Sequence, residues 1–282
     1  MIKWTGKKLA SERCRGILAL SACSRDRFLK DLEENVGAVS PKMIEAITAK
    51  LEVLHPPQEL LIEQINPERY LSGPLRLALV GHDFYRKGGL EVLIAMDRLV
   101  DEGSDVELTI AGKMAAGDYA SKAGEREVAR AEALMEKMGQ RVRRLGSVPG
   151  DQVLALLKAS HILCLPTWGD TYGYSVLEGQ AAGCPAITTN IRALPEVNNN
   201  ACGWVVKVPK REGGDGDLDT GEKREAFREI LVNGIVASLR DACSDRELLV
   251  RKAQASLARI SEEHDLEKHA ARLMEIYQRE SR

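Results

Sequence analysis

A chain of 282 residues with 44% apolar content can bury one large core or two smaller ones, so its length leaves the number of domains open. The formal net charge of -2 argues against a broad basic face for nucleic acid, and no apolar run is long enough to span a bilayer. Because the amino-terminal residues lack an apolar signal core, we expect a cytoplasmic protein, with peripheral membrane contact left open.

Residues 1–70 show few elements of regular secondary structure. The apolar residues 16–20 predict a short strand, and Ser24 is placed to cap the charged helix that follows. A second strand is expected at residues 51–54, where a Pro-Pro pair stops it. Two strands do not make a stable domain, so this segment reads as an incomplete unit followed by a linker.

From residue 71 onwards, strands and helices alternate regularly. Such an alternation predicts an α/β fold with a doubly wound parallel sheet and right-handed crossovers. The strands are expected at 75–80, 106–111, 142–145, 162–166 and 186–189, and helices at 89–102, 124–138, 151–160, from about 173, 226–242, 245–260 and 266–277.

A polar, glycine-rich stretch at residues 207–225 predicts an exposed loop. It contains Asp215-Gly-Asp-Leu-Asp219, which loosely resembles a calcium loop, but the glycine at the sixth position and the glutamate at the twelfth are absent. The six cysteines form no Cys-x2-Cys pair and are predicted to be reduced packing residues. We therefore predict no metal site.

The loop after the first strand of the regular region is suited to bind an anion. The strand ends at Gly81 and His82, and the loop then carries Arg86 and Lys87 before Gly88 opens a helix. Backbone N–H groups, the helix N-terminus and two cations would together attract a phosphate. An ordinary strand-to-helix turn with solvated basic residues fits the same pattern, and these residues alone leave both interpretations open.

A second loop places two carboxylates eight residues apart around a glycine. Asp170 precedes Gly173, and Glu178 lies inside the helix that this glycine opens. A carboxylate is a natural acceptor for two neighbouring hydroxyls, so Glu178 could bind a ribose and Asp170 a second ring, with a diphosphate on the N–H groups of residues 171–175. Alternatively, Asp170 is a helix cap and Glu178 a solvated helix residue.

These motifs together resemble the donor-binding, C-terminal half of the group 1 retaining glycosyltransferases of GT-B fold. The family signature, Glu-Gly-Phe-Gly-x4-Glu followed by Ala-x-Ala-x-Gly-x-Pro, stands here as Asp170-Thr171-Tyr172-Gly173-x4-Glu178 and then Gln180-Ala-Ala-Gly-Cys-Pro185. The likeness extends over about residues 75–277. Further matches, in the same order, are Val80-Gly81 with Arg86-Lys87-Gly88, Leu145-Gly-Ser-Val148, Leu194-Pro-Glu-Val197 and Gly203-Trp-Val-Val206.

The resemblance implies a domain division and an activity. Residues 1–70 would be a remnant of the N-terminal, acceptor-side domain, 71–262 a Rossmann-like nucleotide-sugar-binding domain, and 263–282 a crossover helix. The implied reaction transfers a sugar from a nucleotide diphosphate sugar to an unspecified acceptor with retention, without metal or cofactor. Because most of the N-terminal half is missing, the alternative is a non-catalytic nucleotide-sugar-binding module, or one subunit of a split enzyme whose N-terminal domain is a separate polypeptide.

The resemblance also implies roles for single residues. Glu178 would bind the ribose, Asp170 the transferred sugar and Lys87 the diphosphate. Where the family has an arginine directly after the strand glycine, this chain has His82, and Arg86 would replace that cation. The implied catalytic residues are thus Asp170, Lys87 and Arg86, and the implied donor-binding residues are Gly81, His82, Lys87, Gly88, Val148, Thr171, Tyr172, Gly173, Tyr174 and Glu178.

Overall fold

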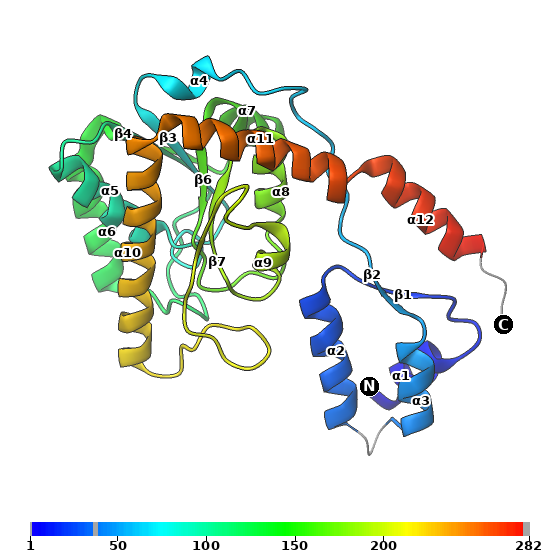
Figure 1. The fold of residues 1–282 in the computed structure, drawn as a ribbon. Coiled ribbons are helices and arrows are strands. Elements are labelled where there is room, and N and C mark those ends of the chain that lie inside the picture. The colour runs from blue at the N-terminus through cyan, green and yellow to red at the C-terminus, as the bar shows by residue number, and fades with distance from the viewer. Residues whose placement is uncertain (1, 36–38, 279–282) are drawn as a thin grey trace. The chain divides into compact units, whose positions relative to one another are not determined.

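Two units make up the chain in the computed structural model, which describes residues 2–35 and 39–278 (Figure 1). Unit 1 comprises Met1–Glu59 and Glu262–Arg282, and unit 2 comprises Leu60–Ser261. The acceptor-side and donor-side roles expected of the domains stay predictions.

Unit 2 is built on a sheet of six parallel strands in the order β5-β4-β3-β6-β7-β8. The predicted α/β class with a doubly wound parallel sheet is therefore confirmed. The strand order reverses between β3 and β6, and in open sheets of this kind ligands bind at that switch, outside the carboxyl ends of the strands. The strands are β3 (Leu75–Val80), β4 (Val106–Ala111), β5 (Val142–Gly146), β6 (Ile162–Leu165), β7 (Ala186–Thr189) and β8 (Trp204–Val206).

Helices cover both faces of this sheet. Figure 1 shows α5, α6 and α10 on one side and α7, α8 and α9 on the other. Every residue of the central strands β6 and β7 is buried, as expected for parallel strands covered on both faces. The helices of this unit are α4 (Glu68–Leu71), α5 (Gly89–Asp101), α6 (Glu125–Met138), α7 (Gly150–Ala159), α8 (Tyr174–Ala181), α9 (Leu194–Val197), α10 (Gly221–Ser244) and α11 (Arg246–Glu263), which continues two residues past the unit boundary.

Unit 1 holds a parallel pair of short strands, β1 (Ile17–Ala19) and β2 (Leu51–Val53), together with α1 (Ile2–Ala10), α2 (Ala22–Glu34), α3 (Pro41–Thr48) and α12 (Leu266–Gln278). A small core of Leu32, Val39 and Ile47 lies among its helices. The last helix, α12, is tied to the strand pair because Arg272 on α12 forms an ion pair with Glu52 on β2.

The structure corrects three details of the sequence-based expectations. Ser21, not Ser24, caps α2, and Ser24 is the third helical residue, whose hydroxyl completes a capping box by accepting from the Ser21 N–H at 3.1 Å. Helices α1, α3, α4 and α9 were not predicted. Helix α10 begins at Gly221 rather than at residue 226, because the Thr220 hydroxyl accepts from the Lys223 N–H at 3.2 Å and caps it there.

The predicted acidic loop before α10 is folded onto itself. An antiparallel bridge joins Lys210 and Gly216, and ion pairs hold Asp215 to Arg192 and Asp219 to Arg211. Its carboxylates are thus neutralised by arginines. Among the residues that the structure describes, no group of histidine, cysteine, aspartate and glutamate side chains could hold a metal ion.

Several reactive side chains are buried and serve packing. All six cysteines are free thiols, and burial raises the pKa of Cys184 to about 12. His161 is buried between the strands and accepts from the Arg76 N–H at 3.1 Å, and burial lowers the pKa of its imidazole to about 4.

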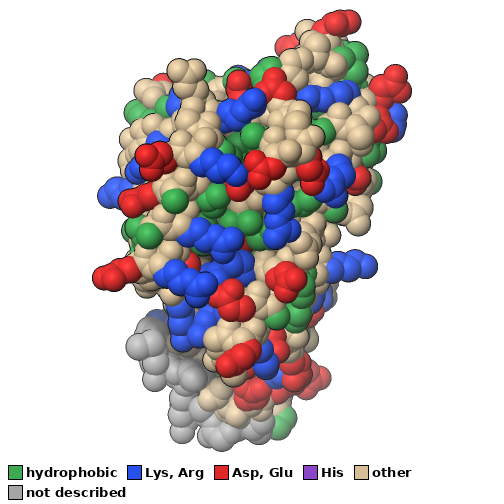
Figure 2. All heavy atoms as spheres, turned by 90° about the vertical axis from the view of Figure 1, so that its left-hand side faces the viewer, with side chains coloured by type: hydrophobic (Ala, Val, Ile, Leu, Met, Phe, Trp, Pro, Cys, Tyr) green, Lys and Arg blue, Asp and Glu red, His purple; other side chains and the backbone are tan. Residues whose placement is uncertain are grey.

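The outer surface over α5, α6 and α10 carries basic and acidic side chains side by side (Figure 2). Within the described ranges, no helix is long and apolar enough to cross a bilayer.

Candidate functional site

Two loops meet where the strand order of unit 2 reverses. Residues 81–88 follow β3, and residues 166–173 follow the neighbouring strand β6. The backbone oxygen of Arg86 accepts from the Trp168 N–H at 2.8 Å and from the Thr167 hydroxyl at 2.9 Å. In return, the Arg86 guanidinium donates to the Gly169 oxygen at 2.5 Å. The loops that the sequence analysis treated separately therefore form one surface.

A glycine makes this close approach feasible. Gly88 has a φ of +82°, and a Cβ there would overlap the Pro166 carbonyl oxygen and lie 2.8 Å from the Pro166 Cγ. Both the left-handed backbone and the contact with the second loop exclude a side chain.

We expect Gly88→Ala to lower the free energy of unfolding by about 2 kcal/mol or more, since a left-handed conformation alone costs about 1–2 kcal/mol and the clash with Pro166 adds to it. Urea denaturation followed by fluorescence measures this loss. Gly103→Ala is a matched control, because Gly103 has a φ of +87° with nothing within 4 Å of its added Cβ. Equal losses for the two variants would contradict the close loop packing.

The two predicted cations of the first loop have different surroundings. Lys87 forms an ion pair with Asp170, and their side chains are only 15% and 12% exposed. Arg86 pairs with Asp83 and holds the pKa of that carboxyl below its usual range through a hydrogen bond. Lys87 is therefore the cation in direct contact with the second loop's carboxylate, whereas Arg86 fastens the loops and its charge is balanced by Asp83.

Helix α8 begins at the predicted place, with Gly173 as its N-cap at a φ of +94°. A Cβ on Gly173 would lie 2.7 Å from Leu194 Cδ2, so the turn packs against α9. The leading N–H groups of a helix lack intrahelical acceptors and carry partial positive charge. The N-terminus of α8 thus adds an anion-binding feature beside Lys87 and Asp170.

Glu178, on α8, is a half-buried carboxylate. Burial raises the pKa of this carboxyl above its ordinary value. In the parts of the chain that the structure describes, no hydrogen bond or ion pair to its side chain is found. A carboxylate that is removed from water without a partner is costly, so the position favours a ligand that donates to it.

The remaining predicted donor-binding residues lie on the same edge of the sheet. Gly81 directly follows β3 and its N–H donates to the Ala111 oxygen at 2.9 Å, while His82 is exposed and Val148 is half-buried in the loop after β5. Around the N-terminus of α8, Thr171 is exposed, Tyr172 is buried and Tyr174 is exposed, and the two tyrosine rings lie 5.3 Å apart. The assignment of these residues to a donor stays a prediction.

Arg192 was missed by the sequence analysis. It donates to the backbone oxygen of Asp170 at 3.3 Å and pairs with Asp215, at a φ of 43° that is unusual for a side chain other than glycine. A signal was present, because Arg192 follows β7 by three residues and the carboxyl ends of parallel strands meet at one edge.

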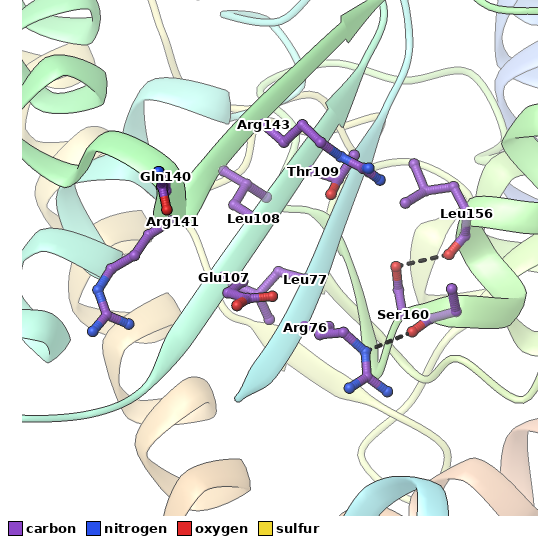
Figure 3. Close-up of a pocket in the computed structure, with 11 residues that line it drawn as sticks. Arg76, Leu77, Glu107, Leu108, Thr109, Gln140, Arg141, Arg143, Leu156 and Ser160 are labelled. Atoms are coloured by element: carbon purple, nitrogen blue, oxygen red, sulfur yellow. Dashed lines mark hydrogen bonds between the residues drawn. The ribbon is translucent and has the colours of Figure 1, made fainter. Parts of the chain in front are cut away.

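Another cavity, of about 290 Å³, lies away from this edge, at the amino-terminal halves of β3, β4 and β5 (Figure 3). Two of its three lining arginines already have partners: Arg76 donates to the Ala159 oxygen at 2.8 Å, and Arg141 pairs with Asp105 at 2.6 Å. Ligands of open α/β sheets bind at the opposite ends of the strands, so this cavity is not the candidate site.

Residues 63–220 match the family described as glycosyl transferases group 1. A glycogen synthase of Mycobacterium tuberculosis is 27% identical over 207 residues, which are 73% of this chain and 43% of that protein. The chain thus spans less than half the length of that relative.

Solved structures share the fold. A sucrose-phosphate synthase from Thermosynechococcus elongatus has a TM-score of 0.63 at 16% identity, covering 98% of this chain and 60% of the other. HepE of Anabaena, in complex with UDP and glucose, has a TM-score of 0.61 at 11% identity, covering 98% of this chain and 80% of the other. At such identities the likeness concerns the fold alone.

Proposed function

Since this chain belongs to the glycosyl transferases group 1 family, we propose that it is the donor-binding part of an enzyme that transfers a sugar from a nucleotide diphosphate sugar. In this proposal the sugar keeps its anomeric configuration and no metal takes part. One observation supports the assignment. Asp170, which is paired with Lys87, lies three residues before Gly173, the N-cap of α8, and the same helix carries the half-buried Glu178. The cytoplasmic location expected from the sequence stays a prediction.

The difficult step of such a reaction is the departure of the nucleoside diphosphate. Negative charge grows on the diphosphate as the bond to the sugar breaks, and fixed positive groups lower the free energy of that state. Lys87 and the leading N–H groups of α8 would supply them without a metal. As Lys87 turns to the diphosphate, Asp170 would lose its partner and accept from hydroxyls of the transferred sugar.

Glu178 would hold the nucleoside. Its carboxylate has two oxygens that can accept from the two neighbouring hydroxyls of a ribose. Because the carboxylate is half-buried and unpartnered, a hydrogen bond to it offsets part of the cost of removing it from water.

The alternative function is a nucleotide-sugar-binding module without activity of its own, or a subunit that completes its site with a separate N-terminal-domain polypeptide. Unit 1 favours it, since its sheet has two strands among the residues that the structure describes. Calorimetry with UDP, GDP and ADP, followed by assays for hydrolysis of the matching nucleotide sugars, separates the two. Binding with turnover supports an enzyme, and binding without turnover supports the module. Failure of all three nucleotides to bind would refute both.

We expect Glu178→Gln to weaken the binding of the preferred nucleoside diphosphate by about tenfold to a hundredfold, because it loses charge-assisted hydrogen bonds to the ribose. Affinity for inorganic pyrophosphate should not change. Calorimetry of both ligands on both proteins measures the difference. Equal losses for the two ligands would contradict a role in holding the ribose.

The same variant should be at least as stable as the original protein at neutral pH. The pKa of the Glu178 carboxyl is raised in the folded chain, so its folding contribution is fully present below the unfolded pKa and is lost as pH rises through the folded value. Glutamine cannot ionise and removes that penalty. Lower stability of the variant at neutral pH would indicate a structural role instead.

A further inference from the structure

A cavity of about 290 Å³ adjoins the loop that carries Asp170. Its walls come from loops at the carboxyl edge of the sheet in unit 2, at residues 119–122, 168–169, 192 and 211–219. None of its lining residues is among those that the resemblance assigns to the donor. Its volume is near the lower end of the range for small-molecule sites, which is about 300–1,000 Å³.

The cavity is connected directly to the candidate site. Gly169 lines it and immediately precedes Asp170, and a Cβ on Gly169 would lie 2.7 Å from the Tyr119 hydroxyl. Arg192 also lines it and donates to the Asp170 backbone oxygen at 3.3 Å. A ligand in this cavity would therefore lie next to the residue proposed to contact the transferred sugar.

Strained backbone gathers in the cavity wall. Among the residues described by the structure, Lys122 with a φ of 51° and Arg192 with a φ of 43° are the non-glycine residues at positive φ, and both line this cavity. Such conformations are unfavourable for residues other than glycine and cluster at sites where ligands bind. Because both positive-φ residues line the same cavity, we interpret this cavity as a ligand-binding site.

The charges of the wall indicate a neutral ligand. Arg192 is paired with Asp215 and Arg211 with Asp219, and Lys122 is the third cation of the wall, so three cations and two carboxylates nearly balance. A phosphate would meet two carboxylates here, which disfavours it. A sugar hydroxyl both donates and accepts, and therefore suits a wall of alternating guanidinium and carboxylate groups.

An aromatic ring completes the wall. Tyr119 is 64% exposed, with the Arg86 guanidinium 5.8 Å from its ring centroid. An exposed aromatic ring gives an apolar surface on which the C–H face of a sugar ring can pack, while its hydroxyl remains available for hydrogen bonds.

We propose that this cavity is a saccharide subsite, which takes a neutral hexose unit of the acceptor beside the transferred sugar. This inference rests on the proposed function, which it deepens by naming the acceptor as a glycan with a neutral hexose. Asp170, on the loop shared by the two sites, would then lie between donor and acceptor.

Nitrogen-15 spectra of the full chain test this subsite, because Trp168 lines the cavity and the chain has three tryptophans, each with one indole N–H. Trp168→Phe assigns its signal. We expect maltotriose or α-1,6-mannobiose to shift this signal saturably, with UDP, GDP or ADP present or absent. Arg211→Met and Tyr119→Ala should each weaken saccharide binding by about tenfold, since each removes a contact of the order of 1.4 kcal/mol.

Arg143→Met is the matched control, because Arg143 is an exposed arginine that lines the cavity of Figure 3 instead. It should leave saccharide binding unchanged, and the Arg211 and Tyr119 variants should keep their nucleotide affinity. Saccharide shifts without any nucleotide binding would uphold the subsite and refute the proposed donor function. No shift with either saccharide, shifts with inorganic phosphate alone, or equal binding by all variants would overturn the subsite.

Discussion

Lys87→Met should weaken the binding of nucleoside diphosphates by about a hundredfold, the largest effect on binding that we expect from any single change. The substitution removes a charge-assisted contact to the diphosphate, of the order of 1.5–3 kcal/mol. It also leaves the Asp170 carboxylate unpaired beside the diphosphate, since Lys87 is its ion-pair partner. Calorimetry measures the affinity, and Lys158→Met, at an exposed position of α7, is the control.

The same ion pair predicts an opposite effect for its other member. Asp170→Asn should strengthen the binding of a free nucleoside diphosphate, because Lys87 no longer has to leave a carboxylate to meet the ligand. It should also recover part of the affinity lost in Lys87→Met when the two are combined. Weaker binding of the free diphosphate by Asp170→Asn would show that Asp170 itself holds that group, and would contradict its assignment to the sugar.

Arg228→Ala should cost about 3–5 kcal/mol of unfolding free energy, because it leaves a buried carboxylate without its partner. Arg228 on α10 donates to Glu91 on α5 at 3.0 Å, and their side chains are 10% and 2% exposed. The guanidinium also lies 5.5 Å from the ring centroid of Trp168, whose indole packs 4.8 Å from Phe227. The network therefore lies beneath the loop that carries Asp170.

A surface ion pair on the same helix is the control. Arg240 on α10 pairs with Glu102 at 2.7 Å, but their side chains are 55% and 46% exposed. Such pairs contribute about 1 kcal/mol at most, so Arg240→Ala should lose far less. Urea denaturation of both variants measures the difference. Similar losses of unfolding free energy in Arg228→Ala and Arg240→Ala would contradict the larger contribution expected of the buried pair.

The loss in Arg228→Ala should also depend on pH. Burial raises the pKa of the Glu91 carboxyl, and removing the nearby cation raises it further. A raised folded pKa gives stability that is present below the unfolded pKa of about 4.5 and disappears as pH rises. The difference between variant and original should therefore be smaller at about pH 5 than at about pH 8. A larger stability difference at the lower pH would mean that Glu91 is not the buried charge that loses its partner in Arg228→Ala.

Local patterns predicted the elements of unit 2 well. Strands β3, β4 and β7 have the expected limits, and β6 ends one residue early, because short apolar runs bounded by glycine, proline and polar residues leave little choice. The ends of α2 and α10 were harder to place. Capping depends on which of several serine or threonine hydroxyls reaches a backbone N–H, and Ser21 and Thr220 do so where the sequence suggested other positions.

Periodicity and glycine placement are local properties, so the amino-acid sequence alone predicted the α/β class, a candidate site at the carboxyl ends of the strands, and the residue types available there. Which of those residues meet depends on the tertiary structure. Lys87 and Asp170 are 83 residues apart and pair because β3 and β6 are neighbours in the sheet. The same packing buried Glu91 against Arg228 and brought Arg192 to Asp170, contacts that depend on strand order and helix docking rather than on local sequence.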